Sequence, residues 1–428
     1  MRTINVVALC AVLGCVTATR AQSDLQRELK DLDIAAHWIY DDLPKGLAQA
    51  KADSKPLLVV LRCVPCPPGK DLDGKVMQPD KDIEELEKKF VCVRVIQTKG
   101  LDLKLFQYDY DQSWAAFFLN ADGTIYGRYG TRGGRGPESD AHLTLASFKK
   151  AAERALEIHK KYPENKEELA DKIGKAPDYK VPEVIPGLDE RSKGSPTTRQ
   201  TCIHCHMVRE YALRAKWKDK KLTAADLWVY PLPSSIGLTM DTDDGLRIKA
   251  VAADSPAAKA GLKAGDELMQ LAGQRLISEA DIQWVLHNSA NDAKLRVAFA
   301  HEGKLVTATI EVAGNWKEGD IAWRASSWYG LRQGLKVDPL TADEKKKRSL
   351  GEDDLGLVIK GLFGTGGQAL TKAGLKQNDV IVAIDGKTAA LTESQFLAAL
   401  RLQHGPDDSV KLTILRGEQR MEIQVPMW

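Results

Sequence analysis

The sequence predicts a multidomain protein with an α/β domain first, a helical linker next and two mainly β domains at the end. Three observations predict this order. A continuous apolar strand runs into a C-x-x-C motif near residue 60, residues 161–229 are rich in Lys, Pro and Glu, and one pattern occurs twice in the C-terminal half. The length of 428 residues agrees with several domains, since one domain usually has about 100–200 residues.

Composition and charge exclude some classes of protein. Hydrophobic residues make up 43% and charged residues 28%, which is typical of a globular chain. Lys and Arg total 61 and Asp and Glu total 59, a net charge of +2, so we expect no nucleic-acid partner for the chain as a whole. Seven cysteines are too few for a disulfide scaffold, and each is therefore interpreted individually.

The first 22 residues have the order of an export signal. Arg2 supplies a positive charge, residues 4–16 are apolar, and small residues lead to Ala21. The apolar run is too short for a lasting anchor, and no other stretch reaches the ~18 residues that a membrane span needs. Cys15 stands in a pattern that resembles a lipoprotein cleavage box. We therefore expect a periplasmic or extracytoplasmic protein, either free or anchored at Cys15.

Residues 23–160 are expected to form the α/β domain. Its buried central strand is predicted at 56–61, directly before Cys63-Val64-Pro65-Cys66. Cys92 alternates within a second apolar strand and is predicted to be buried. The remaining elements are predicted as a helix at 80–90, a strand at 90–95, a hairpin at 114–129 and a helix at 143–159.

This order resembles the thioredoxin superfamily, and the lead-in from His37-Trp38 to Lys55-Pro56 is similar to its exported single-domain branch. The resemblance implies that Cys63 attacks a disulfide and that Cys66 resolves the mixed disulfide. Arg62 stands beside Cys63 in the sequence, where its charge would lower the pKa of the thiol.

Two departures from the thioredoxin pattern leave an alternative open. Pro67-Pro68 follow Cys66, and the residue before a proline avoids helical backbone, so we expect the next helix to start near Asp71. Trp114-Ala115-Ala116 stands where the family has a cis-proline facing the motif. A static disulfide or an inactive site is therefore the alternative to thiol–disulfide exchange.

The linker at 161–229 contains Cys202-Ile203-His204-Cys205-His206. C-x-x-C-H is the attachment signature of c-type haem, with two thioethers and one axial histidine. It predicts haem c on Cys202 and Cys205, with His206 as a ligand of the haem iron. The alternatives are a disulfide or a plain helix start, and a metal site that uses His204 or His206. A basic amphipathic helix is predicted to follow at 209–221.

The C-terminal half contains a tandem repeat. The motif Gly261-Leu262-Lys263 through Leu268 recurs 113 residues later from Gly374. The copies are assigned to residues 230–318 and 325–428, each with short strands that suit a half-open β-barrel. Two strands are predicted to close each copy, at 295–300 and 305–312 in the first and at 410–416 and 419–425 in the second. The second copy carries an insertion at 341–354, which we expect to be a solvated loop.

Both copies resemble PDZ domains of the bacterial envelope type. In that family a Gly-Leu loop holds the carboxylate of a polypeptide C-terminus, and the peptide adds as a strand. The resemblance places these loops at Gly237-Leu238 and Gly330-Leu331. Polypeptide C-termini or envelope proteins are the partners it implies, and the alternative is a packing module with a covered groove. The chain shows no G-x-S-x-G motif and no plausible Ser/His/Asp set, so a protease is not expected.

The complete domain order resembles a bacterial envelope family described as thioredoxin-like/PDZ (seleno)proteins. We therefore expect an exported redox protein that performs thiol–disulfide exchange, haem electron transfer or both, and that PDZ domains recruit to polypeptides. The alternative is a non-catalytic envelope scaffold. The apolar C-terminus at 425–428 is a further candidate, as a peptide for the PDZ groove of another copy.

Overall fold

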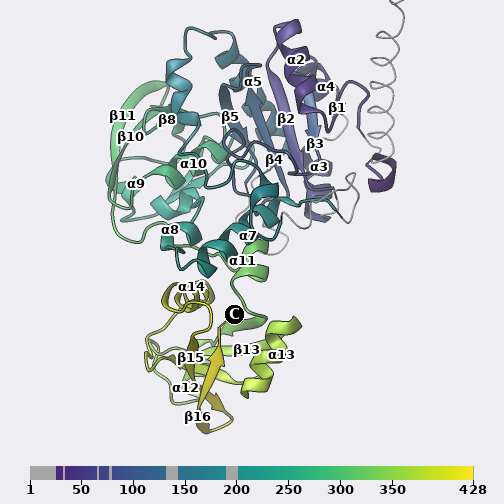
Figure 1. Ribbon diagram of the computed structural model, residues 1–428. Helices are drawn as coiled ribbons and strands as arrows, with labels where there is room; N and C mark the ends of the chain where they lie inside the picture. Colours follow the sequence, from purple (N-terminus) through teal and green to yellow (C-terminus); the bar gives the residue numbers. More distant parts are fainter. Residues whose placement is uncertain are drawn as a thin grey trace, which may run out of the picture. The chain divides into compact units, whose positions relative to one another are not determined.

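The computed structural model describes residues 26–31, 34–64, 67–76, 80–131, 143–188 and 201–427. The predicted export signal with Cys15, and also Cys66, lie outside the described residues. The chain forms two compact units (Figure 1). The first unit contains residues up to 205 together with 230–317, and the second contains 206–229 and 318–428. Within the described residues, no helix has the length and apolar character needed to cross a bilayer.

A five-stranded mixed sheet forms the centre of the thioredoxin-like domain, with the order β1-β3-β2-β4-β5. The central strand β2 is buried along its whole length, as its continuous apolar sequence predicts. It pairs with β3 in parallel and with β4 antiparallel. The five strands are β1 (Ile39–Tyr40), β2 (Leu57–Arg62), β3 (Val91–Val95), β4 (Trp114–Leu119) and β5 (Ile125–Tyr129).

Apolar side chains alternate along this sheet and fill a core on each face. Leu58 and Phe118 belong to one core, and Leu57 and Phe117 belong to the other. The helices of the domain are α2 (Leu43–Asp53), α3 (Pro67–Val76), α4 (Lys81–Glu87) and α5 (Leu145–His159). The start expected for α3 near Asp71 is wrong, because proline is compatible with the first helical turn and the helix begins at Pro67.

The segment after α5 packs on the same domain. It forms two short 3-10 helices, η1 (Glu167–Lys172) and η2 (Pro182–Val184). The Leu103 N–H donates to the Lys180 carbonyl at 3.0 Å, and the Lys172 side chain is completely buried. The part of the predicted linker up to residue 188 is therefore built into the first unit. The later helices of the linker are α7 (Cys205–Lys218) and α8 (Ala224–Leu227).

The first PDZ copy pairs β6 with β7 and has a four-stranded sheet in the order β11-β10-β8-β9. Its strands are β6 (Leu238–Met240), β7 (Ile248–Val251), β8 (Glu267–Leu271), β9 (Gln274–Arg275), β10 (Ala293–His301) and β11 (Lys304–Val312). Its helices are η3 (Pro233–Ile236), α9 (Pro256–Lys259) and α10 (Glu279–Asn288). The two closing strands that the sequence predicts are β10 and β11.

The second PDZ copy has one sheet in the order β12-β13-β14-β15-β16, so β12 is an edge strand. Its strands are β12 (Leu335–Pro339), β13 (Leu357–Leu362), β14 (Val380–Ile384), β15 (Ser409–Arg416) and β16 (Gln419–Pro426). Its helices are α11 (Ala325–Gly330), α12 (Ala342–Lys346), α13 (Gly364–Ala373) and α14 (Glu393–Gln403). The short helix α12 lies within the predicted insertion and buries no residue.

The end of the chain is part of the fold of the second copy. Met427 is only 2% exposed and belongs to the core of this copy. Its N–H donates to the Asp408 carbonyl at 2.8 Å, and its carbonyl accepts from the Asp407 N–H at 3.2 Å. These bonds hold the C-terminal segment in place up to Met427, which argues against its capture by a PDZ groove of another copy.

Candidate thiol site and peptide-binding grooves

Cys63 lies at the carboxyl end of the central strand β2 and is buried, with 3% of its surface exposed. Its N–H donates to the Ser113 carbonyl at 3.0 Å, which joins the thiol loop to the residue before β4. Gly69 of α3 lies close to this loop, because a Cβ there would stand 2.9 Å from the Cys63 carbonyl oxygen. The backbone of Cys63 is therefore held in place at the end of β2 by the residue before β4 and by the start of α3.

Arg62 does not provide an uncompensated charge beside Cys63. Its guanidinium forms an ion pair with Asp73 and a longer one, at 3.4 Å, with Asp31. Arg94 completes the cluster through contacts of 2.9 Å to Asp31 and 2.6 Å to Asp73. Two arginines and two carboxylates thus neutralise one another. The expected effect of Arg62 on the Cys63 pKa is therefore not favoured by the structure.

The C-x-x-C-H motif is folded against the thioredoxin-like domain. Ile203 is fully buried, and its carbonyl accepts two hydrogen bonds from Thr98, at 3.1 Å from the N–H and 2.9 Å from Oγ1. Cys205 belongs to the same apolar core as Cys63 and Phe106. The two cysteine motifs of the chain therefore meet in one place, although the linker assignment separates them.

His204 provides the polar group at this meeting point. Its Nδ1 lies 3.0 Å from the Cys63 Sγ, across 141 positions of sequence. Tyr108 interacts with both Cys205 and Cys63, and burial raises its pKa well above the usual range, with a smaller contribution from the charge of Cys205. Tyr108 therefore remains a neutral phenol, and an imidazole beside a thiol is the arrangement that turns a cysteine into a nucleophile.

The surroundings of the motif do not fit a haem. Cys202 and Cys205 are 1% and 4% exposed and are covered by protein atoms. The ring of His206 stacks on Tyr329 within the second unit, with 5.9 Å between ring centroids. A haem c needs both thiols at the edge of one porphyrin and the histidine on its iron. The haem stays a prediction of the sequence, and we derive no chemistry through it.

Metal ligands do not gather elsewhere in the described residues. Among the described residues, which do not include Cys66, no three His, Cys, Asp or Glu side chains come together as a possible metal site. Four cysteines are described, and none of them forms a disulfide: Cys63, Cys92, Cys202 and Cys205. Cys92 is buried, and burial raises the pKa of its thiol well above the usual value.

In the first PDZ copy, the predicted Gly-Leu loop turns at Gly237. Gly237 has a φ of +89°, and a Cβ there would come within 2.1 Å of the Ser255 side chain. Leu238 follows as the first residue of β6. The preceding η3 contacts helix α10, so this helix lies beside the loop.

Helix α10 is covered by the rest of the first unit. Its residues 279–286 are all buried. Tyr230 stacks on His287 at one end, with 4.2 Å between ring centroids. On the side of the thioredoxin-like domain, Asp281 lies 2.9 Å from Lys172 and 3.9 Å from Arg128. Trp284 stacks on the Arg128 guanidinium at 3.8 Å. This copy therefore uses its helix as a packing surface.

In the second copy, the loop lies four residues later than the sequence predicts. Gly330 is the last residue of α11, and Leu331 caps that helix and is 2% exposed. The position of Gly237-Leu238 is occupied by Gly334 and Leu335, where β12 begins. Gly334 has a φ of +77°, and a Cβ there would lie 2.2 Å from the Phe363 carbonyl oxygen.

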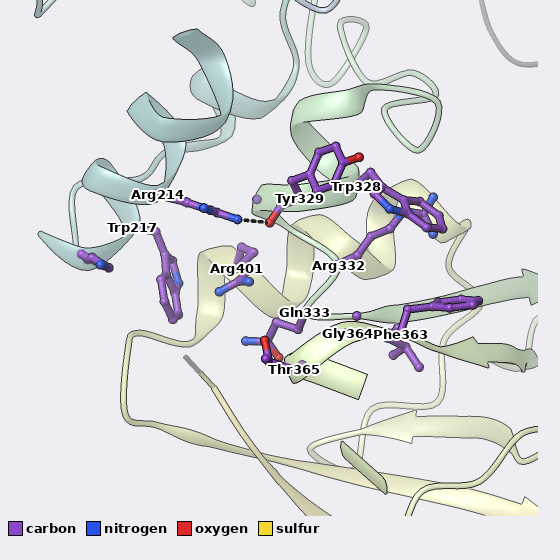
Figure 2. A pocket seen from close by; sticks show the side chains of 15 residues that line it. Arg214, Trp217, Trp328, Tyr329, Arg332, Gln333, Phe363, Gly364, Thr365 and Arg401 are labelled. Carbon is purple, nitrogen blue, oxygen red and sulfur yellow. Dashed lines mark hydrogen bonds between the residues drawn. The ribbon is translucent and has the colours of Figure 1, made fainter. Parts of the chain in front are cut away.

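A cavity of about 660 Å³ opens at this loop (Figure 2). Arg214 and Trp217 of α7 form one wall, and Arg401 of α14 lies between them and the loop. The sequence pattern does not assign these three residues to the groove, because α7 precedes the repeat and Arg401 lies 70 positions after Leu331. The apolar alternation Leu335, Val337 after the second Gly-Leu pair is the signal that identifies the correct loop.

Comparisons with known proteins agree with these domains. The sequence matches the family described as Thioredoxin-like over residues 38–121, and the family described as PDZ domain over residues 234–312 and 366–427. The chain therefore has a thioredoxin-like domain near its N-terminus, followed by PDZ domains.

Curated relatives share the PDZ region. A probable periplasmic serine endoprotease DegP-like from Pseudomonas savastanoi pv. phaseolicola is 32% identical over 189 residues, which is 43% of this chain and 37% of the relative. The protein of the same name from Marinomonas sp. is 31% identical over 156 residues, 36% of this chain and 31% of the relative. The chain thus spans about a third of the length of these relatives. A solved structure titled HtrA-type protease AlgW with decapeptide is 17% identical and covers 31% of this chain and 47% of its own, with a TM-score of 0.20.

Proposed function

We propose that this protein is a periplasmic thiol–disulfide exchange protein. Cys63 is the attacking thiol, His204 is its base, and the second PDZ copy recruits a polypeptide. The observation that carries the proposal is the 3.0 Å contact between the Cys63 Sγ and the His204 Nδ1, inside a domain of the thioredoxin-like class. The periplasmic location is supported by the DegP-like relatives, whose names place them there.

The proposed reaction balances as an ordinary disulfide exchange. His204 accepts the proton of the Cys63 thiol, and the thiolate attacks one sulfur of a substrate disulfide. A mixed disulfide forms, and the other substrate sulfur leaves as a thiolate and is protonated. A second protein thiol then attacks Cys63 and releases the reduced substrate. The substrate gains two electrons and two protons, and the protein retains an internal disulfide.

Two cysteines are candidates for the second thiol: the C-x-x-C motif suggests Cys66, and the shared apolar core suggests Cys205. Cys66 lies outside the described residues, whereas Cys205 shares the apolar core of Cys63. A single-cysteine trap separates the two. The variant that accumulates a mixed disulfide with a substrate, Cys66→Ser or Cys205→Ser, identifies the resolving thiol.

Alkylation of Cys63 tests the role of His204. We expect His204→Gln to lower the rate of Cys63 alkylation by iodoacetamide at pH 7 by about tenfold, because the thiolate loses its base. His206→Gln is the matched control and should change the rate less than about twofold, since that ring stacks on Tyr329. Equal rates in His204→Gln and the wild type would reject the Cys63–His204 pair as the reactive centre.

The burial of Cys63 favours a second candidate, a scaffold without catalysis. In that case the double variant Cys63→Ala/Cys66→Ala would retain partner binding and the cellular phenotype. Loss of the phenotype with intact partner binding would instead support exchange. Insulin reduction by the purified protein gives an independent measure of exchange.

A visible spectrum with an intact mass tests the haem prediction. Because Cys202 and Cys205 are covered by protein atoms, we expect protein matured in the periplasm to be colourless, with both thiols unmodified. A Soret band together with a mass increase of one haem would show that the motif is used for attachment.

A further inference from the structure

The cavity of the second PDZ copy has a strongly cationic lining. Among the fifteen residues that line it, four carry positive charge and none is Asp or Glu. The four cations are Arg214, Lys218, Arg332 and Arg401. Such a lining selects an anionic ligand, because unlike charges across a desolvated surface attract and like charges repel.

Two of these cations have carboxylate partners that lie outside the lining. Arg214 pairs with Glu210 at 3.1 Å and donates to the Tyr329 carbonyl at 2.7 Å (Figure 2). Arg332 pairs with Glu393. The carboxylates fix both guanidinium groups in place, and two carboxylates against the four cations of the lining still leave a positive balance at the cavity.

Arg401 is also a buried member of this group. It is 6% exposed, its Nε donates to the Leu331 carbonyl at 3.1 Å, and its guanidinium packs on the Trp217 ring at 4.2 Å. Burial lowers the pKa of Arg401 to about 9, and this shift includes a smaller contribution from the charge of Arg214. A bound anion would relieve the repulsion between these two cations.

Exposed aromatic side chains border the same cavity. Trp328, Tyr329 and Phe363 are 39%, 56% and 49% exposed, although large apolar side chains of this kind are usually buried. Figure 2 shows them around the mouth of the cavity. Aromatic side chains beside cations suit a ligand that has apolar groups as well as negative charge.

The strand that leaves the cavity has a free edge. β12 begins at Leu335 and is the edge strand of its sheet. An extended peptide can add to such an edge through main-chain hydrogen bonds. A chain end placed in the cavity would therefore have its preceding residues beside β12.

We propose that this cavity binds the acidic C-terminal segment of another polypeptide. The terminal carboxylate and a neighbouring Asp or Glu side chain contact Arg214 and Arg401, and an apolar side chain packs on the exposed aromatic residues. The inference rests on the proposed recruiting function and specifies its ligand. The described segment that ends at Met427 is unsuitable as this ligand, because Met427 is held in the core of the same copy.

Fluorescence anisotropy with synthetic ten-residue peptides on the full chain tests the proposal. The set varies two features, a free C-terminal carboxylate or an amide, and Glu or Gln at the preceding two positions. We expect the acidic peptide with a free carboxylate to bind at least about tenfold more tightly than the amidated Gln peptide. Added salt should weaken the binding of the acidic peptide more than that of the Gln peptides.

Arg214 is the residue to change, because its side chain is 41% exposed, whereas Arg332 and Arg401 are buried. Arg214→Gln should weaken the acidic peptide about tenfold and the Gln peptide less than about twofold, and Arg214→Lys should have an intermediate effect. Lys372→Gln, at an exposed position of α13 outside the lining, is the matched control. Thermal melting confirms that each variant is folded.

The outcomes separate the two proposals. Binding of every peptide with equal affinity overturns the acidic preference but leaves recruitment standing. Equal weakening by Arg214→Gln and Lys372→Gln overturns the role of the cavity. If none of the peptides binds, the recruiting function of the second copy fails together with this inference.

Discussion

The two PDZ copies have corresponding helices, α10 in the first and α14 in the second, and they differ in what packs on these helices. In the first copy, α10 is buried along residues 279–286 against the thioredoxin-like domain and Tyr230. In the second copy, α14 borders a cavity of about 660 Å³ through Arg401. The two copies therefore have one fold, and they differ in which neighbouring residues pack on the corresponding helix. A copy can bind a partner beside this helix only when the surrounding chain does not cover that surface.

The N-caps of the two helices make this comparison direct. Ser278 caps α10 and Thr392 caps α14, so His287 and Arg401 occupy corresponding positions. Tyr230 stacks on the histidine, and Trp217 stacks on the arginine. One copy has an aromatic pair there, and the other has a cation–π pair that faces a cavity.

The substitution with the largest expected effect tests the burial of α10 in the first copy. Asp281→Asn removes the carboxylate that compensates Lys172 and Arg128, and both of these cations are buried. We expect a loss of about 3–5 kcal/mol in the free energy of unfolding, because two buried charges lose their partner. Urea denaturation measures it.

The corresponding position in the second copy gives the control. Gln395 is the N3 residue of the α14 capping box and is only partly buried. Gln395→Ala should cost about 0.5–1 kcal/mol. If the two substitutions had equal effects, the two helices would not differ in burial as described.

A second substitution tests the packing around Arg401. Trp217 is 6% exposed, and its indole N–H donates to the His404 carbonyl at 2.8 Å. Trp217→Ala should destabilise the second unit by about 3 kcal/mol, because it removes a large buried ring and a cation–π contact. Tyr230→Ala in the first copy should cost about 1 kcal/mol, since that ring is only partly buried. The reverse order would contradict this difference.

Hydrogen exchange sharpens the assignment of peptide binding to one copy. When an acidic peptide saturates the protein, we expect amides of β12 to exchange about tenfold more slowly, because the peptide adds to this edge strand. Amides of β6 should be unchanged. Slower exchange in β6 with no change in β12 would assign the groove to the other copy.

The smallest expected effect concerns the insertion that only the second copy has. Thr341 forms a capping box with Glu344 at the start of α12, which buries no residue. Thr341→Ala should cost at most about 1 kcal/mol and leave peptide affinity unchanged. A clear loss of affinity would show that the insertion contributes to the groove.

Sequence patterns predicted the elements of both domain types well. The continuous apolar run before Cys63 is the central strand β2, and the last predicted pair of strands is β15 and β16. Such patterns report whether a side chain faces a core or water, and this is set locally along a strand.

The sites were harder to predict, because they depend on pairs of distant residues. Nothing in the spacing of Cys63 and His204 indicates that they meet, since 141 positions separate them. The haem signature also directs attention to His206, although it is the other histidine that contacts the thiol. In the second copy, two Gly-Leu pairs occur within six residues, and only the backbone shows that Gly334 precedes the strand.

The two hydrogen bonds from Thr98 to the Ile203 carbonyl have a consequence for the boundaries of the domain. They join residues 201–205 to the loop after β3. Cys205 of this segment is thereby held in the apolar core that contains Phe106 and Cys63. A fragment that ends at residue 160 would leave that core open to water and would lose the histidine beside its thiol. The thioredoxin-like domain is therefore not an independent folding unit that ends at residue 160, because residues 201–205 complete its core.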